Sequence, residues 1–166
     1  MIKPIVIFPD ERLTTPCRPV TAFDESLREL AKNLIDTLTN SKRLGVGLSA
    51  NQIGDQRRVF VIDFTAGKNP AAAQVFVNPS IRKYRGKEHT EIEGCLSLPP
   101  GNDCSVRRHT IVNWQAQDLD GNPISGKFHD FAARVFQHEV DHLSGIMINQ
   151  RAAGKRWEGF LGGHEA

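Results

Sequence analysis

The stretch FAARVFQHEVDHLSG, residues 131–145, is the most informative part of the sequence for the fold. Its apolar residues recur at helical spacing, which predicts a helix from Phe131 to Leu143. Asp130 is the expected N-cap, and Gly145 lies just past the predicted end. We expect short strands to pack around this central helix.

His138 and His142 stand at positions i and i+4 of the sequence HEVDH, so a helix places both imidazoles on one face. Two imidazoles at this spacing can grip one metal ion, and Glu139 between them lies close enough to move a proton. The alternative is a solvated helix that carries two ordinary histidines. The spacing is typical of metal-dependent hydrolases, so we favour the metal site.

A catalytic metal site usually takes three protein ligands and a water, so the two histidines need a partner. Ile148 stands where the metzincin pattern would place a further histidine. Glu158 or His164, in a glycine-rich tail, would complete a zincin-like protease. Cys95 is the better candidate, because a thiolate is a strong ligand for zinc and iron(II). A lone cysteine is more often a small buried residue, so the residues alone leave the choice open.

The composition fits one globular domain of 166 residues. With 21 Lys and Arg against 19 Asp and Glu, the net charge of +2 is too balanced to favour nucleic acid or an anionic membrane. No apolar run approaches the roughly 18 residues of a membrane span, and we expect neither a signal peptide nor a transit peptide. The cysteines are odd in number and fit reduced thiols in the cytoplasm: Cys17, Cys95 and Cys104. An oxidative bond between Cys104 and Cys95 is the less favoured alternative.

The remaining pattern predicts an α+β fold. A first helix begins near Asp24, capped by Asp24 or Thr21, and carries an apolar stripe at helical spacing. Strand-like runs follow at residues 58–63, 74–78 and 111–117, separated by turn residues. We therefore expect one compact catalytic domain over residues 1–151, with antiparallel or mixed short strands. Residues 152–166 are expected to be a short tail with at most one short helix.

Three segments together resemble peptide deformylase: GVGLSANQ (45–52), EGCLS (93–97) and QHEVDHLSG (137–145). Their order and spacing match that family, and the likeness covers nearly everything from Met1 to about Arg151. The resemblance implies a compact α+β fold with one metal ion. It implies an enzyme that removes the formyl group from N-formylmethionyl peptides of nascent proteins and releases formate.

Matched position by position, the resemblance implies three metal ligands: Cys95, His138 and His142. Glu139 would act as general base and then general acid, while hydroxide attacks the formyl carbon. Gln52 and the backbone N–H of Leu96 would hold the oxyanion. The metal would be Fe²⁺ in the cell, with Zn²⁺ or Ni²⁺ bound after purification.

Further residues are expected around these groups. The substrate would meet four residues of the matched motifs: Gly45, Val46, Gly47 and Val135. The resemblance implies a buried ion pair between Glu93 and Arg107 that supports the cysteine loop. Asp141 is either a solvated helix acid or the partner that orients a ligand imidazole.

The chain also departs from the family pattern. Ser49 stands where the family usually has alanine and adds a hydroxyl near the site. Residues 98–103 replace a segment that in some members helps to hold the peptide backbone. The tail lacks the long basic helix that some members dock on the ribosome, so ribosome docking is not supported, and a monomer is favoured. A binding protein without turnover is the remaining alternative, but the intact matched residues favour an enzyme.

Overall fold

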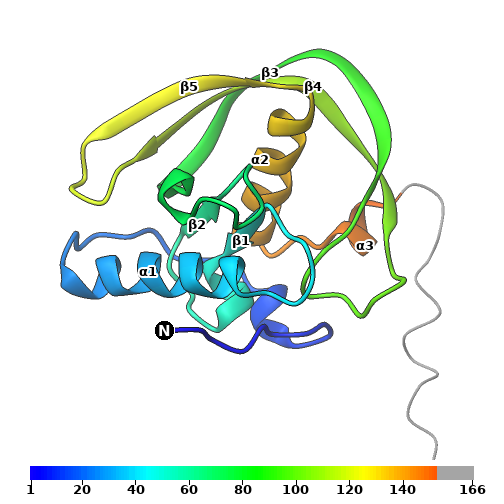
Figure 1. Cartoon of the computed structure of the whole chain (residues 1–166). Helices are drawn as coiled ribbons and strands as arrows, with labels where there is room; N and C mark the ends of the chain where they lie inside the picture. Colours follow the sequence, from blue (N-terminus) through cyan, green and yellow to red (C-terminus); the bar gives the residue numbers. More distant parts are fainter. Residues whose placement is uncertain (153–166) are drawn as a thin grey trace, which may run out of the picture.

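The computed structural model describes residues 1–152, which form a five-stranded antiparallel sheet and two long helices (Figure 1). The strands are β1 (Gly47–Ser49), β2 (Val59–Ile62), β3 (Gln74–Glu93), β4 (Cys104–Gln117) and β5 (Pro123–His129). The helices are α1 (Glu25–Thr39), α2 (Asp130–Leu143) and the single turn α3 (Ile148–Arg151). Short 3-10 helices lie at Glu11–Leu13, Ala50–Ile53 and Pro70–Ala72.

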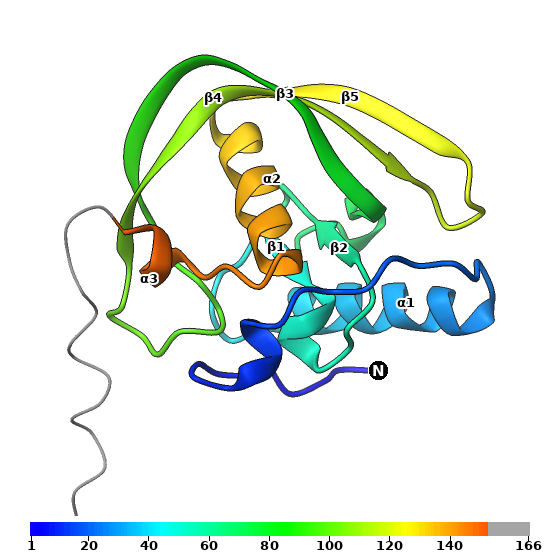
Figure 2. The same ribbon diagram turned by 180° about the vertical axis from the view of Figure 1, so that it is seen from behind.

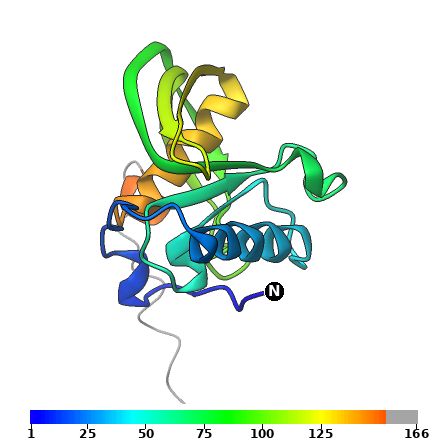
Figure 3. The ribbon, with the colours of Figure 1, turned by 90° about the vertical axis from the view of Figure 1, so that its left-hand side faces the viewer.

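The sheet curves around α2 (Figures 1 and 2). The long strands β3 and β4, together with β5, arch over one side of this helix, and β1 and β2 lie on its other side. Helix α1 covers the opposite face of β1 and β2, as the side view in Figure 3 shows. The central position predicted for α2 is therefore confirmed.

Strand β2 lies between the two long helices, and each helix packs against one of its faces. All its residues are buried, and alternate side chains point to opposite faces. Val59 and Val61 join the apolar cluster of α1, whereas Phe60 and Ile62 join that of α2. The continuous apolar run thus reflects burial on both faces.

The predicted helices are confirmed, with one difference at the start of α2. Asp24 caps α1, and its side chain accepts a hydrogen bond from the backbone N–H of Leu27. In α2 the N-cap is His129 and not Asp130. The chain passes from β5 into α2 without a loop, and Asp130 makes the turn with a φ of 47°.

The three predicted strands are present, but their bounds differ. The run at 58–63 is longer than β2, whereas the runs at 74–78 and 111–117 are shorter than β3 and β4. The apolar run at 74–78 only begins β3, which continues to Glu93 through an exposed, mainly polar stretch. That stretch has no hydrophobic period, and the antiparallel partner β4 holds it extended. Strand β5 is missing from the prediction, because only Ile124 and Phe128 in its sequence are large apolar residues and none of its residues is buried.

The predicted tail helix, Glu158 and His164 lie outside the described residues. Among residues 1–152 the structure contains no helix with the length and apolar character needed to cross a bilayer.

Candidate active site

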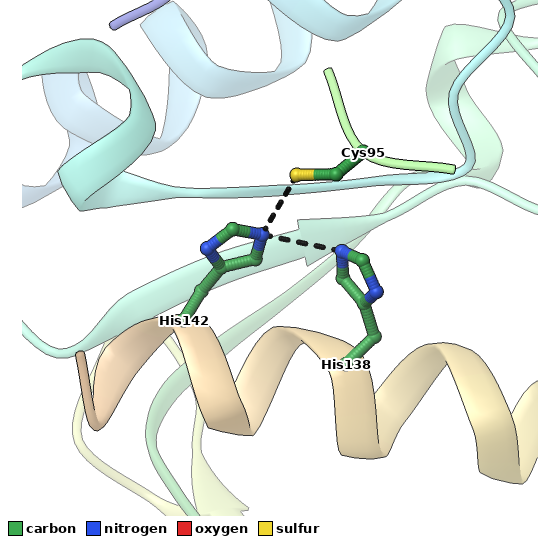
Figure 4. Close-up of side chains that lie close together, drawn as sticks. All are labelled: Cys95, His138 and His142. Carbon is green, nitrogen blue, oxygen red and sulfur yellow. Dashed lines mark hydrogen bonds between the residues drawn. The ribbon is translucent and has the colours of Figure 1, made fainter. Parts of the chain in front are cut away.

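The structure brings Cys95, His138 and His142 together (Figure 4). Cys95 follows the end of β3, and the two histidines lie on successive turns of α2. Cys95 Sγ lies 3.3 Å from His142 Nε2, which lies 3.2 Å from His138 Nε2. All three donor atoms lie within 4.8 Å of one another.

These residues fit a divalent metal ion. Tetrahedral bonds of about 2.0–2.3 Å to nitrogen and sulfur require donors about 3.3–3.6 Å apart, close to the two separations observed. Burial lowers the pKa of His142 well below its ordinary value, which favours the neutral imidazole that a metal needs. The Nδ1 atom of His138 contacts Glu93, so its Nε2 faces the cluster.

Glu93 is the anchor of this arrangement. Its carboxylate lies 2.9 Å from His138 Nδ1 and accepts hydrogen bonds from Arg108 and Arg134, at 2.9 and 2.7 Å respectively. Burial alone would raise the pKa of the Glu93 carboxyl, but the hydrogen bonds from His138 and Arg108 hold this pKa well below its usual range. An ionised Glu93 therefore fixes the orientation of the His138 ring.

The predicted pairing of Glu93 with Arg107 is wrong by one residue. The Arg107 side chain is 67% exposed and lies 3.3 Å from Glu88, whereas Arg108 makes the buried pair. Neighbouring residues of a strand point to opposite faces. Cys104 and Val106 are buried on β4, so the parity of the strand places residue 108 inside.

The predicted contact of Asp141 with a ligand imidazole is also wrong. The Asp141 carboxylate accepts a short hydrogen bond from Arg108 and one of 2.6 Å from Arg151. Asp141 therefore acts on His138 only indirectly, by holding the arginine that holds Glu93.

Glu139 lies on the buried side of α2 with both carboxylate oxygens constrained. Ser49 Oγ donates to Oε2 at 2.6 Å. A Cβ atom at Gly47 would lie only 2.3 Å from Oε1, so the lack of a side chain there makes room for the carboxylate. Burial raises the pKa of Glu139 above its ordinary value, although the hydrogen bond from Ser49 opposes this rise.

Gly47→Ala is expected to lower turnover by roughly 100-fold, because it displaces this carboxylate by about 1 Å. Gly45→Ala is the matched comparison, since its Cβ would meet only the flexible side chains of Leu96 and Leu38, at 2.9 and 3.3 Å. Steady-state kinetics with melting curves for both variants will measure the effect. Equal losses in the two variants would contradict this account of Gly47.

The side-chain amide of Gln52 is held in one orientation beside the candidate metal ligands. Its Oε1 accepts from the backbone N–H of Ser49 at 2.9 Å, and its Nε2 donates to Ser97 Oγ at 3.0 Å. Nε2 also lies 3.7 Å from Cys95 Sγ. The amide N–H group therefore points toward the candidate metal ligands. Ser49 and Ser97 contribute here through contacts that the sequence-based reasoning did not predict.

A cavity of about 300 Å³ opens beside these groups. Its lining includes the predicted oxyanion donor Leu96 together with the four residues predicted to meet substrate: Gly45, Val46, Gly47 and Val135. The sequence-based reasoning missed three other apolar residues of the lining, all exposed: Leu44, Ile92 and Phe131. It also missed an ion pair in the wall, in which Arg134 Nε lies 3.2 Å from Glu91. The cavity thus combines apolar residues with charged ones, and the pair of Arg134 and Glu91 lies at its wall beside the proposed catalytic groups.

Comparison with known proteins agrees with this site. The family model described as polypeptide deformylase matches residues 2–157. The chain belongs to the polypeptide deformylase family. A peptide deformylase of Acidobacterium capsulatum is 42% identical over 148 residues, covering 89% of this chain and 85% of that protein. One from Dictyoglomus thermophilum is 40% identical over 152 residues, covering 92% and 94%.

Solved peptide deformylase structures share the fold. The crystal structure of the enzyme from Thermotoga maritima has a TM-score of 0.83 and 33% identity, covering 92% of this chain and 99% of that one. A peptide deformylase structure from Legionella pneumophila has a TM-score of 0.84 and 38% identity, covering 93% and 88%. The deformylase resemblance of the sequence and the α+β expectation are both confirmed.

Proposed function

We propose that this protein is a metal-dependent hydrolase that removes the formyl group from N-formylmethionyl peptides of nascent proteins and releases formate. The observation that carries this proposal is one constellation: a cysteine and two histidines at metal-binding distances, next to a buried carboxylate and an oriented amide. Membership of the deformylase family supports the same reaction.

The proposed ligands are Cys95, His138 and His142. A divalent ion held by one thiolate and two neutral imidazoles supplies Lewis-acid activation of water at neutral pH. The donor set suits both zinc and iron(II). We propose Fe²⁺ in the cell, with Zn²⁺ or Ni²⁺ in protein purified in air.

The proton transfers fall to Glu139. Its Oε2 is held by Ser49, so Oε1 is the oxygen placed next to Gly47, in the wall of the cavity. This carboxylate accepts the proton of the attacking water and then returns it to the amine of the departing peptide. Burial raises the pKa of the Glu139 carboxyl. A carboxylate with a raised pKa is a stronger base toward the attacking water, and it retains the proton until the amine of the departing peptide accepts it.

The developing negative charge on the formyl oxygen needs preformed donors. Gln52 Nε2 is oriented for this by its two flanking hydrogen bonds, and the backbone N–H of Leu96 is the proposed second donor. Val46 and Val135, both in the cavity lining, are proposed to contact the methionine side chain. The three cysteines are free thiols, in keeping with a cytoplasmic site of action. The proposal includes a monomer.

The proposal is tested by formate release from a formyl-Met-Ala-Ser peptide, with protein loaded anaerobically with Fe²⁺. The Glu139→Ala variant is the control, and its turnover is expected to be about 10²–10⁴-fold lower. Metal content and melting curves will verify that the variant is folded and loaded. Absence of formate release by the folded, metal-loaded protein would refute the proposal.

A further inference from the structure

Strand β1 presents two residues to the proposed general base. Gly47 and Ser49 are two positions apart, so they lie on the same face of the strand, and both contact Glu139. Leu48 between them faces the cluster of α1. Ser49 is completely buried, so its hydroxyl has only protein partners.

The Ser49 hydroxyl has two acceptors within reach. Oε2 of Glu139 lies at 2.6 Å and the backbone carbonyl oxygen of the same residue at 3.3 Å. The shorter contact is to the carboxylate, and a hydrogen bond to an ionised acceptor is the stronger kind. The hydroxyl therefore donates to Oε2.

This hydrogen bond restrains the terminal side-chain torsion of Glu139, which is otherwise the least restricted. The terminal torsion of a glutamate side chain is broad, so packing alone does not fix the plane of its carboxylate. The Gly47 backbone limits the carboxylate on the Oε1 side, and Ser49 fixes it on the Oε2 side. Together they fix the plane of the carboxylate, with one oxygen bonded to Ser49 and the other beside Gly47.

We propose that Ser49 is a positioning residue for Glu139. Its hydroxyl fixes the plane of the carboxylate, so that the oxygen not bonded to Ser49 is left for substrate, while its backbone N–H donates to the amide oxygen of Gln52 at 2.9 Å. A single buried serine thus aligns the group that moves the proton and the group that stabilises the oxyanion. This inference rests on the proposed deformylase function.

The experiment compares Ser49→Ala with Thr37→Val in the metal-loaded protein. Thr37 is a buried residue of α1 whose hydroxyl accepts a 2.9 Å hydrogen bond from the backbone of Lys3, away from the cavity. Ser49→Ala is expected to lower kcat about tenfold with KM changed less than about twofold, given the strength of a hydrogen bond to a charged group. Thr37→Val is expected to lower the melting temperature and leave kcat unchanged.

A double-mutant cycle gives the second readout. In a Glu139→Ala background, Ser49→Ala is expected to cause no further loss of the residual turnover. In metal-stripped protein, the melting shifts of the two changes are expected to be non-additive, because both remove the same bond. An unchanged kcat in Ser49→Ala, or additive effects in the cycle, would overturn the proposal. If the wild-type protein released no formate, the proposed function would fail, and the melting cycle would still decide whether Ser49 holds Glu139.

Discussion

Cys95→Ala is expected to weaken metal binding by more than about 100-fold and to abolish formate release. Residues that only orient a metal ligand are typically worth about 10–100-fold in affinity, so loss of a ligand must exceed this. The two histidines that remain leave fewer protein ligands than a catalytic site usually takes. Metal content after dialysis against a buffered chelator will measure the effect.

Cys104→Ala is the matched control. Cys104 is also a buried free thiol and packs in the same apolar cluster as Cys95, but it is not part of the metal-ligand group. We expect it to retain its metal and its turnover. A Cys95→Ala protein that keeps both, combined with loss of activity on truncation after Arg151, would instead indicate a protease-like site with a ligand in the tail.

Glu93→Ala is expected to lower the free energy of unfolding by about 3 kcal/mol, near the lower end of the range for breaking a buried ion pair. The substitution removes the carboxylate between Arg108 and Arg134, whose side chains are 3% and 8% exposed. Arg108 keeps Asp141, which limits the loss. Urea unfolding of metal-stripped protein separates this effect from the weaker metal binding that loss of the His138 partner also causes.

Glu91→Ala provides the comparison for Glu93→Ala. Glu91 contacts the same Arg134, at 3.2 Å, but its side chain is 48% exposed. Exposed pairs contribute only about 0–1 kcal/mol, so this variant should unfold almost as the wild type does. Equal destabilisation by the two substitutions would show that burial of Glu93 does not determine its contribution.

The parts of this molecule that follow a local period could be predicted from the sequence. The two helices and the pairing of His138 with His142 on one face depend on a spacing of a few residues. Strand β2 was found because its apolar run is short and flanked by turns. The choice of Cys95 as the third residue of the cluster needed the family resemblance, because nothing in the sequence around a lone thiol specifies a partner 43 to 47 residues away.

The parts that depend on distant contacts could not be predicted in this way. The outer half of β3 is polar on both faces and is a strand only because β4 pairs with it. The choice between Arg107 and Arg108 is an exception, because the burial expected of Cys104 and Val106 on the same strand would have indicated that residue 108 points inward. The bond between Ser49 and Glu139 joins residues 90 positions apart, and no local pattern encodes it.

The strand order of the sheet bears on how the protein is made. Each strand pairs with the next one in the chain, so the sheet can grow by successive hairpins as the polypeptide leaves the ribosome. Helix α2 follows the last strand, and it carries both histidines and Glu139. Cys95 is made before β4, but both histidines follow the last strand, so the sheet can form before the ligand group is complete. The ligand group is thus completed only by α2, after every strand of the framework that surrounds it has been made.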